Sequence, residues 1–119
     1  IRIEDPFFLY VEALVEQNDL STAKTTLEDF MHNYRDPSYT LTATTQAAMR
    51  EEVRTQRRIE LWGEGTSFFD FKRWHLGVDR SEAGSNHTFN VVVPAGDKRW
   101  VYQIPQDEIE SNSQMVQNE

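Results

Sequence analysis

The 119-residue sequence lacks cysteine, and it has no apolar run approaching the roughly 18 residues of a transmembrane helix. The missing thiols exclude disulfides, cysteine-ligated zinc and thiol nucleophiles. Basic residues are also scarce, with 12 against 20 acids and a formal net charge of −8. A surface of this sign repels phosphate backbones, so nucleic acid is not an expected partner.

The residues that are present favour a mainly α-helical fold. Apolar side chains recur at helical spacing after Pro6, and again from Ser21, the expected N-cap of a second helix, to a stop at 35–37. The repeating residues are Phe7, Tyr10, Val11, Leu14 and Val15, then Ala23, Leu27, Phe30, Met31 and Tyr34. Residues 1–37 therefore predict an antiparallel hairpin of about the size of a tetratricopeptide unit. That repeat's sequence pattern is only partly present, and the chain holds no second copy.

Residues 46–76 predict a helix–turn–helix. Its first helix, at about 46–62, is polar on nearly every side, which is typical of a helix that exchanges ion pairs with its neighbours. Gly63 and Gly65 permit a tight reversal, and an aromatic helix is expected at about 67–76. A structural network of ion pairs and hydrogen bonds is predicted at this junction, formed by Arg57, Arg58, Glu60, Glu64 and Asp70.

Residues 77–119 predict a loop-rich tail. A short strand is expected at 90–93, a turn at 94–97, and a second extended run where apolar and polar residues alternate at 99–104. A helical turn is predicted after Pro105. The whole chain is thus expected to contain three or four helices and at most one short two-stranded ribbon near 91–102.

Several motifs in the second half occur together in one order. They are RRIELWGEG at 57–65, FFDFKRW at 68–74, VPAGDKRWVYQIPQDEI at 93–109, and Asn112, which four residues separate from the pair Gln117-Asn118. In this order they resemble the C-terminal region of the SusD/RagB-like family. The likeness covers essentially the whole chain. Ser67 and Ser113 depart from it, because the family often has arginine and proline there.

The resemblance implies a larger parent protein, tethered to the outer membrane at the cell surface by an N-terminal lipidated cysteine. Such proteins capture oligosaccharides and cover a TonB-dependent, SusC-like transporter. Their tetratricopeptide-like helices mostly pack on that transporter. The first residue is not methionine and no leader follows it, as expected of an excised or mature segment, and 118–119 resembles a natural C-terminus. The resemblance implies a binding protein without cofactors rather than an enzyme. The residues alone also allow a tetratricopeptide-like adaptor for protein–protein interaction.

Two sets of residues are candidates for a site. Glu60 and Glu64 have the spacing to share a helix face as a glycosidase acid and nucleophile, but the nearby arginines favour structural ion pairing. Among the aromatics that could stack on a sugar, Trp62, Trp74, Trp100 and Tyr102 stand out, although helical spacing favours core packing. Trp100 and Tyr102 lie on one side of the expected extended run. They are the candidates for ligand binding and are predicted to be half-buried.

The remaining motifs give little. His32, His75 and His87 are too scattered for a local metal site, and 79–84 lacks two calcium ligands. The sequence Gly63-Glu64-Gly65 follows a helix and lacks the third glycine of a phosphate-binding loop, and 86–88 matches a glycosylation acceptor by its tripeptide alone. Neither a metal ion nor a catalytic set is expected.

Overall fold

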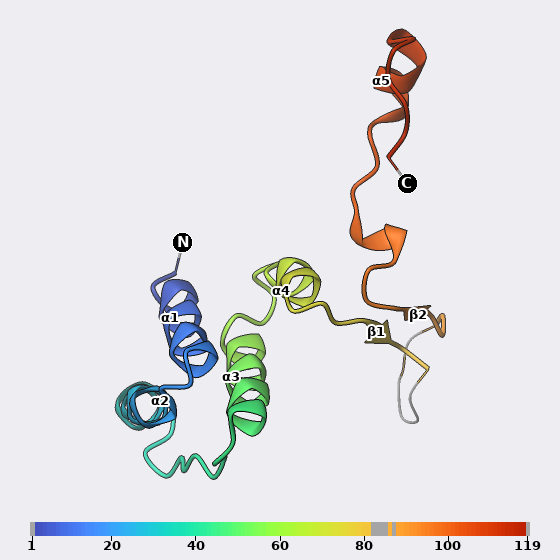
Figure 1. Ribbon diagram of the computed structural model, residues 1–119. Helices are drawn as coiled ribbons and strands as arrows, with labels where there is room; N and C mark the ends of the chain where they lie inside the picture. The colour runs from blue at the N-terminus through green and yellow to red at the C-terminus, as the bar shows by residue number, and fades with distance from the viewer. Residues whose placement is uncertain (1, 82–85, 87, 119) are drawn as a thin grey trace. The chain divides into compact units, whose positions relative to one another are not determined.

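The computed structural model describes residues 2–81, 86 and 88–118, which form two compact units, Ile1–Gly65 and Thr66–Glu119. The described residues contain five α-helices and one two-stranded ribbon, so the prediction of a mainly α-helical chain is confirmed (Figure 1). None of the helices within the described residues is long and apolar enough to cross a membrane. The boundary between the units falls inside the predicted 46–76 segment.

Unit 1 contains three helices, α1 (Glu4–Glu16), α2 (Leu20–Tyr34) and α3 (Gln46–Glu60). The first helix packs against both of the others (Figure 1). It runs antiparallel to α2, because Glu4 at its start lies 3.2 Å from the guanidinium of Arg35, just beyond the end of α2. The predicted helical hairpin is therefore present, with a third helix packed on its first member.

Local hydrogen bonds explain where these helices begin and end. Asn18 adopts a left-handed conformation with φ of 61°, which closes α1. Asp19 then caps α2, and its carboxylate accepts a hydrogen bond from the backbone N–H of Thr22 at 3.2 Å. The prediction of Ser21 as the N-cap is wrong by two residues, because the turn at Asn18 already presents Asp19. Thr45 caps α3 in the same way.

The core of unit 1 lies where α1 faces α2 and α3. Its buried residues are Phe8, Val11, Val15, Ala23, Leu27, Met31, Leu41, Met49 and Val53. Phe8 is fully buried although the sequence pattern pointed to Phe7, and Tyr10 is 53% exposed. Contact with two neighbouring helices turns the buried face of α1 toward Phe8.

The end of α3 carries the glycine reversal that the sequence predicts. The helix stops at Glu60, two residues earlier than expected. Gly63 and Gly65 have φ angles of 79° and 77°, a region in which any side chain would be strained. The chain leaves unit 1 through this turn.

Unit 2 begins with the aromatic helix α4 (Ser67–Arg73), shorter than predicted, and includes α5 (Gln106–Ser111) at the helical turn expected after Pro105. Its ribbon pairs β1 (Val78–Asp79) with β2 (Val92–Val93) in antiparallel register, Val78 opposite Val93. The strand expected at 90–93 is thus present, but its partner is not the 99–104 run. The true partner lies in a segment expected to be loop.

Two features explain this pairing. Gly77 lets the strands approach closely, since a Cβ atom there would lie 2.7 Å from the carbonyl oxygen of Val93. Meanwhile the carboxylate of Asp97 accepts a hydrogen bond from the backbone N–H of Arg99 at 2.9 Å. This bond starts the 3₁₀ turn Lys98–Trp100 and prevents the predicted extended run from beginning there.

Candidate functional site

Ion pairs join the ends of the three helices in unit 1. We call this group the helix-end cluster; its members are Arg2, Glu4, Arg35, Glu60 and Glu64. Glu60 is the centre, because Arg35 donates to its two oxygens at 2.7 and 2.6 Å and Arg2 donates at 2.7 Å. Arg2 also reaches Glu64 at 3.1 Å, so the structure brings the predicted Glu60 and Glu64 together through one guanidinium.

The electrostatics of Glu60 suit ion pairing. Hydrogen bonds from Arg35 lower the pKa of its carboxyl below the ordinary value, although partial burial opposes the shift. A glycosidase acid needs the opposite, a raised pKa that keeps its proton near neutral pH. Glu60 is therefore held as a carboxylate whose oxygens are occupied, which is the arrangement of a structural anion.

The other predicted network residues are divided between the two units. In unit 1 Arg57 is buried and donates to the carboxylate of Asp5 at 2.6 Å, while Arg58 is exposed. In unit 2 the buried Asp70 accepts from Arg73 at 2.9 Å. A single network that includes all five predicted residues stays a prediction.

Replacing Glu60 by glutamine should destabilise unit 1 by about 1–3 kcal/mol at pH 7, since two arginines lose a charged acceptor. The lowered pKa makes this stabilisation fully present above the ordinary value of 4.5, and it is lost as the pH falls through the lowered pKa. The difference between the variant and the unsubstituted chain should therefore be complete at pH 7 and shrink as the solution is acidified below pH 4.5. Urea denaturation over a series of pH values, followed by circular dichroism, measures the difference.

A suitable control is Glu51→Gln on the same helix. Glu51 also pairs with an arginine, Arg54, but its side chain is 68% exposed. Its replacement should change the free energy of unfolding by less than about 0.5 kcal/mol. Equal effects of Glu51→Gln and Glu60→Gln on the free energy of unfolding at pH 7 would mean that the helix-end cluster does not stabilise unit 1.

Unit 2 is organised around a cluster of aromatic rings contributed by α4 and the segment after β2. Phe71 stacks on Trp100, with ring centroids 6.3 Å apart and planes 12° apart. Phe68 contacts both Trp100 and Tyr102, at 5.5 and 5.1 Å, and Trp74 lies 6.3 Å from Phe71. These rings form the apolar centre of a unit with little regular secondary structure.

The four candidate stacking residues divide into two groups. Trp74 and Trp100 are each only 8% exposed, whereas Trp62 and Tyr102 are 86% and 71% exposed. The prediction that Trp100 and Tyr102 are half-buried on one side of an extended run is wrong. The 3₁₀ turn buries Trp100, whose indole N–H donates to the carbonyl of Pro94 at 2.8 Å, and leaves Tyr102 outside. A ligand-binding role for either residue stays a prediction.

The C-terminal motif has a structural role that the sequence reading missed. The side-chain amide of Gln117 accepts from the backbone N–H of Ile104 at 2.9 Å and donates to its carbonyl at 3.0 Å. Asn118 donates to the carbonyl of Tyr102 at 3.0 Å. The two side-chain amides thus form the hydrogen bonds that a neighbouring strand would otherwise form with the backbone at 102–104. The adjacent Gln117 and Asn118 at the end of the C-terminal motif were the feature of the sequence that could have indicated this role.

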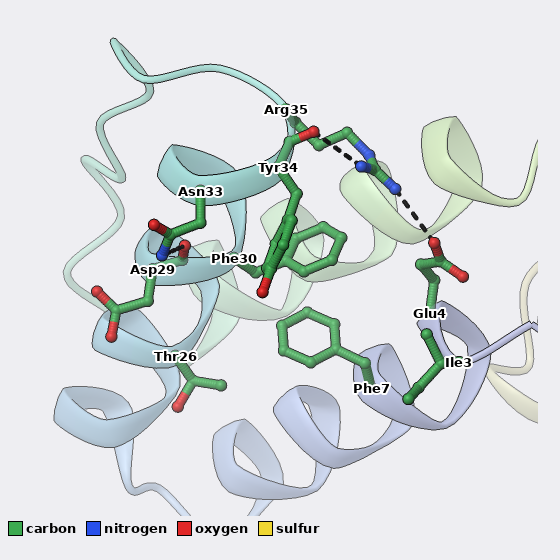
Figure 2. Close-up of a pocket in the computed structure, with 9 residues that line it drawn as sticks. All are labelled: Ile3, Glu4, Phe7, Thr26, Asp29, Phe30, Asn33, Tyr34 and Arg35. Atoms are coloured by element: carbon green, nitrogen blue, oxygen red, sulfur yellow. Dashed lines mark hydrogen bonds and ion pairs between the residues drawn. The ribbon is translucent and has the colours of Figure 1, made fainter.

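An open groove lies between α1 and α2, with a volume of about 670 Å³ (Figure 2). We call it the hairpin groove; it is lined by Ile3, Glu4, Phe7, Thr26, Asp29, Phe30, Asn33, Tyr34 and Arg35. Figure 2 shows aromatic rings from both helices around its centre and polar side chains from α2 along one edge. The groove could not be predicted from the sequence, because residues of the two helices combine only after the hairpin closes.

The remaining candidates do not come together. His32 hydrogen-bonds to the carbonyl of Tyr39 at 2.6 Å, and within the described residues no three histidine, aspartate or glutamate side chains gather to hold a metal ion. Asp79 accepts from the backbone and hydroxyl of Ser81, at 2.8 and 2.6 Å. Residues 82–84 of the candidate calcium loop, and His87 of the glycosylation tripeptide, lie outside the described residues.

These features define a helical protein whose described part offers surfaces for binding. The family model for the SusD family matches residues 1–119, so the chain belongs to the SusD family, as its motifs predicted. The chain is accordingly placed among SusD-like nutrient-binding proteins. Comparisons with curated proteins and with solved structures found no match.

Proposed function

We propose that the chain is the C-terminal portion of a cell-surface glycan- or nutrient-binding lipoprotein, which delivers oligosaccharides to a TonB-dependent outer-membrane transporter. The observation that carries this proposal is the match to the SusD family over residues 1–119. Anchoring is assigned to a lipidated cysteine of the parent protein, outside this sequence. The transporter partner is SusC-like, as in the family that the chain resembles.

The burial of the aromatic rings in unit 2 bears on where the parent protein binds its oligosaccharide. Of the candidate stacking residues in unit 2, Trp74 and Trp100 are buried, which leaves Tyr102 as the one exposed ring among them. Sugar recognition requires exposed aromatic faces that converge with polar groups in a concave site. The oligosaccharide is therefore assigned mainly to parts of the parent protein that this chain does not include.

The isolated chain should accordingly bind no oligosaccharide with useful affinity. Isothermal titration calorimetry of residues 1–119 against a panel of defined glycans should give no heat beyond dilution. The longer parent protein, titrated with the same panel, should bind at least one of them. Binding by the parent protein would show that the panel contains a suitable glycan, so the lack of binding by the isolated chain would mean that the site lies outside it.

Two outcomes would contradict the proposal. Micromolar binding of a glycan by the isolated chain, abolished by Trp100→Ala while the chain stays folded, would place the sugar site in this half. A parent protein that purifies from outer-membrane extracts without any TonB-dependent transporter would remove the delivery role.

A second candidate function is a tetratricopeptide-like adaptor for protein–protein interaction, and the hairpin groove is the observation that favours it. The two functions are compatible in one molecule, because the groove belongs to unit 1 and the oligosaccharide is assigned mainly to parts of the parent protein outside this chain. Further repeats of about 34 residues upstream, without a lipoprotein signal, would favour the adaptor.

A further inference from the structure

The floor of the hairpin groove is aromatic. Phe7 of α1 stacks on Phe30 of α2, with centroids 4.5 Å apart, and Tyr34 lies 5.7 Å from Phe30. Tyr34 is 69% exposed, and Ile3 at one end is 81% exposed (Figure 2). An exposed aromatic next to half-buried rings in a concave surface suits an inserted apolar side chain, above all an aromatic one.

The charged residues that line the groove are Glu4, Asp29 and Arg35. Asp29 is exposed, and no side chain in the described part of the molecule pairs with its carboxylate. By contrast, Arg35 is fully engaged, since its guanidinium donates to Glu60, Glu4 and the carbonyl of Tyr34. The uncompensated charge in the groove is therefore negative, in a chain whose net charge is −8.

We propose that the hairpin groove is a docking site for a protein segment that inserts an aromatic side chain flanked by lysine or arginine. The ring would lie on Phe7, Phe30 and Tyr34, and the flanking cation would pair with Asp29. Charge complementarity selects this occupant, because a basic segment meets an unpaired carboxylate. The proposal does not depend on the nutrient that the parent protein binds, so it extends the proposed function.

Two other occupants fit less well. A neutral sugar brings no cation to pair with the exposed carboxylate of Asp29. A second copy of the chain would bring two acidic surfaces together, and like charges oppose such association. The groove thus favours a basic aromatic segment of another protein.

The test uses the ¹⁵N-labelled chain and a blocked peptide, Gly-Lys-Phe-Lys-Gly. Amide shifts in nuclear magnetic resonance spectra should change saturably at Phe7, Asp29, Phe30 and Tyr34. The peptides Gly-Glu-Phe-Glu-Gly and Gly-Lys-Ser-Lys-Gly should each bind at least about tenfold more weakly, because one repels Asp29 and the other lacks the anchor.

Two variants assign the binding to the groove. Asp29→Asn should lower the affinity for the basic peptide by about threefold and reduce the salt dependence of binding, as expected for one exposed ion pair. Tyr34→Ala should weaken it by at least about tenfold. The matched control is Tyr10→Ala, since Tyr10 is 53% exposed but does not line the groove; its binding should be unchanged.

Several results would overturn the proposal. They are shifts away from the groove, no saturable shifts, or equal binding of the acidic and basic peptides. The proposal also fails if an oligosaccharide perturbs the groove amides and the basic peptide does not. Finally, a concentration-dependent dimer in sedimentation, abolished by Tyr34→Ala, would identify a second copy of the chain as the occupant.

Discussion

Replacing Phe8 by alanine is expected to destabilise unit 1 by about 3–5 kcal/mol, because a fully buried aromatic ring is lost and a cavity remains. Phe8 lies in edge contact with Phe7 and Phe30, at 5.3 and 5.8 Å, so its removal loosens both helices of the hairpin. A small domain has a total stability of roughly 5–15 kcal/mol, of which this is a large share. Thermal and urea unfolding, followed by far-ultraviolet circular dichroism, measure the loss.

Leu9→Ala is the matched control, because Leu9 is the next residue of α1 and is 42% exposed. It removes an apolar side chain from the same helix, so it tests burial rather than helix propensity, and its cost should stay below about 1 kcal/mol. If the two variants unfold at the same temperature, α1 does not bury the face that contains Phe8.

The hairpin could be predicted because its signals are local. Spacing of apolar residues, the interruption at Asn18 and the stop after Tyr34 all lie within a few residues of the elements that they define. The choice between Phe7 and Phe8 could not be made in this way. Both positions fit a helical period, and which one is buried depends on α1 packing against two helices at once.

Unit 2 was less predictable because its order depends on contacts between distant segments. The partner of β2 at Val78–Asp79 is too short to show an alternating pattern of its own. The alternation at 99–104 indicated a strand, but capping by Asp97 produced a turn instead. A local hydrogen bond therefore overrode the hydrophobic pattern.

The candidate sites show the same limit. Glu60 and Glu64 could be identified from the sequence as ion-pairing residues. Within unit 1 they pair with Arg2 and Arg35, which lie more than 20 residues away and reach Glu60 only once the three helices pack together. The hairpin groove depends on the same closure, since Phe7 and Phe30 come from different helices.

Replacing Trp100 by alanine should unfold unit 2. Trp100 is 8% exposed, stacks on Phe71, contacts Phe68 and satisfies the carbonyl of Pro94 through its indole N–H. Truncation leaves a cavity and an unsatisfied carbonyl, at a cost of about 3–5 kcal/mol. With so few other buried residues, unit 2 cannot absorb this loss. Near-ultraviolet circular dichroism and amide hydrogen exchange of 66–118 should both show the collapse of its packing.

Tyr102→Ala is the comparison that shows whether the ring of Trp100 stabilises the core of unit 2 or is free to stack on a ligand. Tyr102 also contacts Phe68 but is 71% exposed, so its removal should cost less than about 1 kcal/mol and preserve the near-ultraviolet spectrum. If Trp100→Ala instead leaves unit 2 as stable as Tyr102→Ala does, the ring does not support the core. Trp100 would then be available to a ligand, and the oligosaccharide site would have to be sought in unit 2.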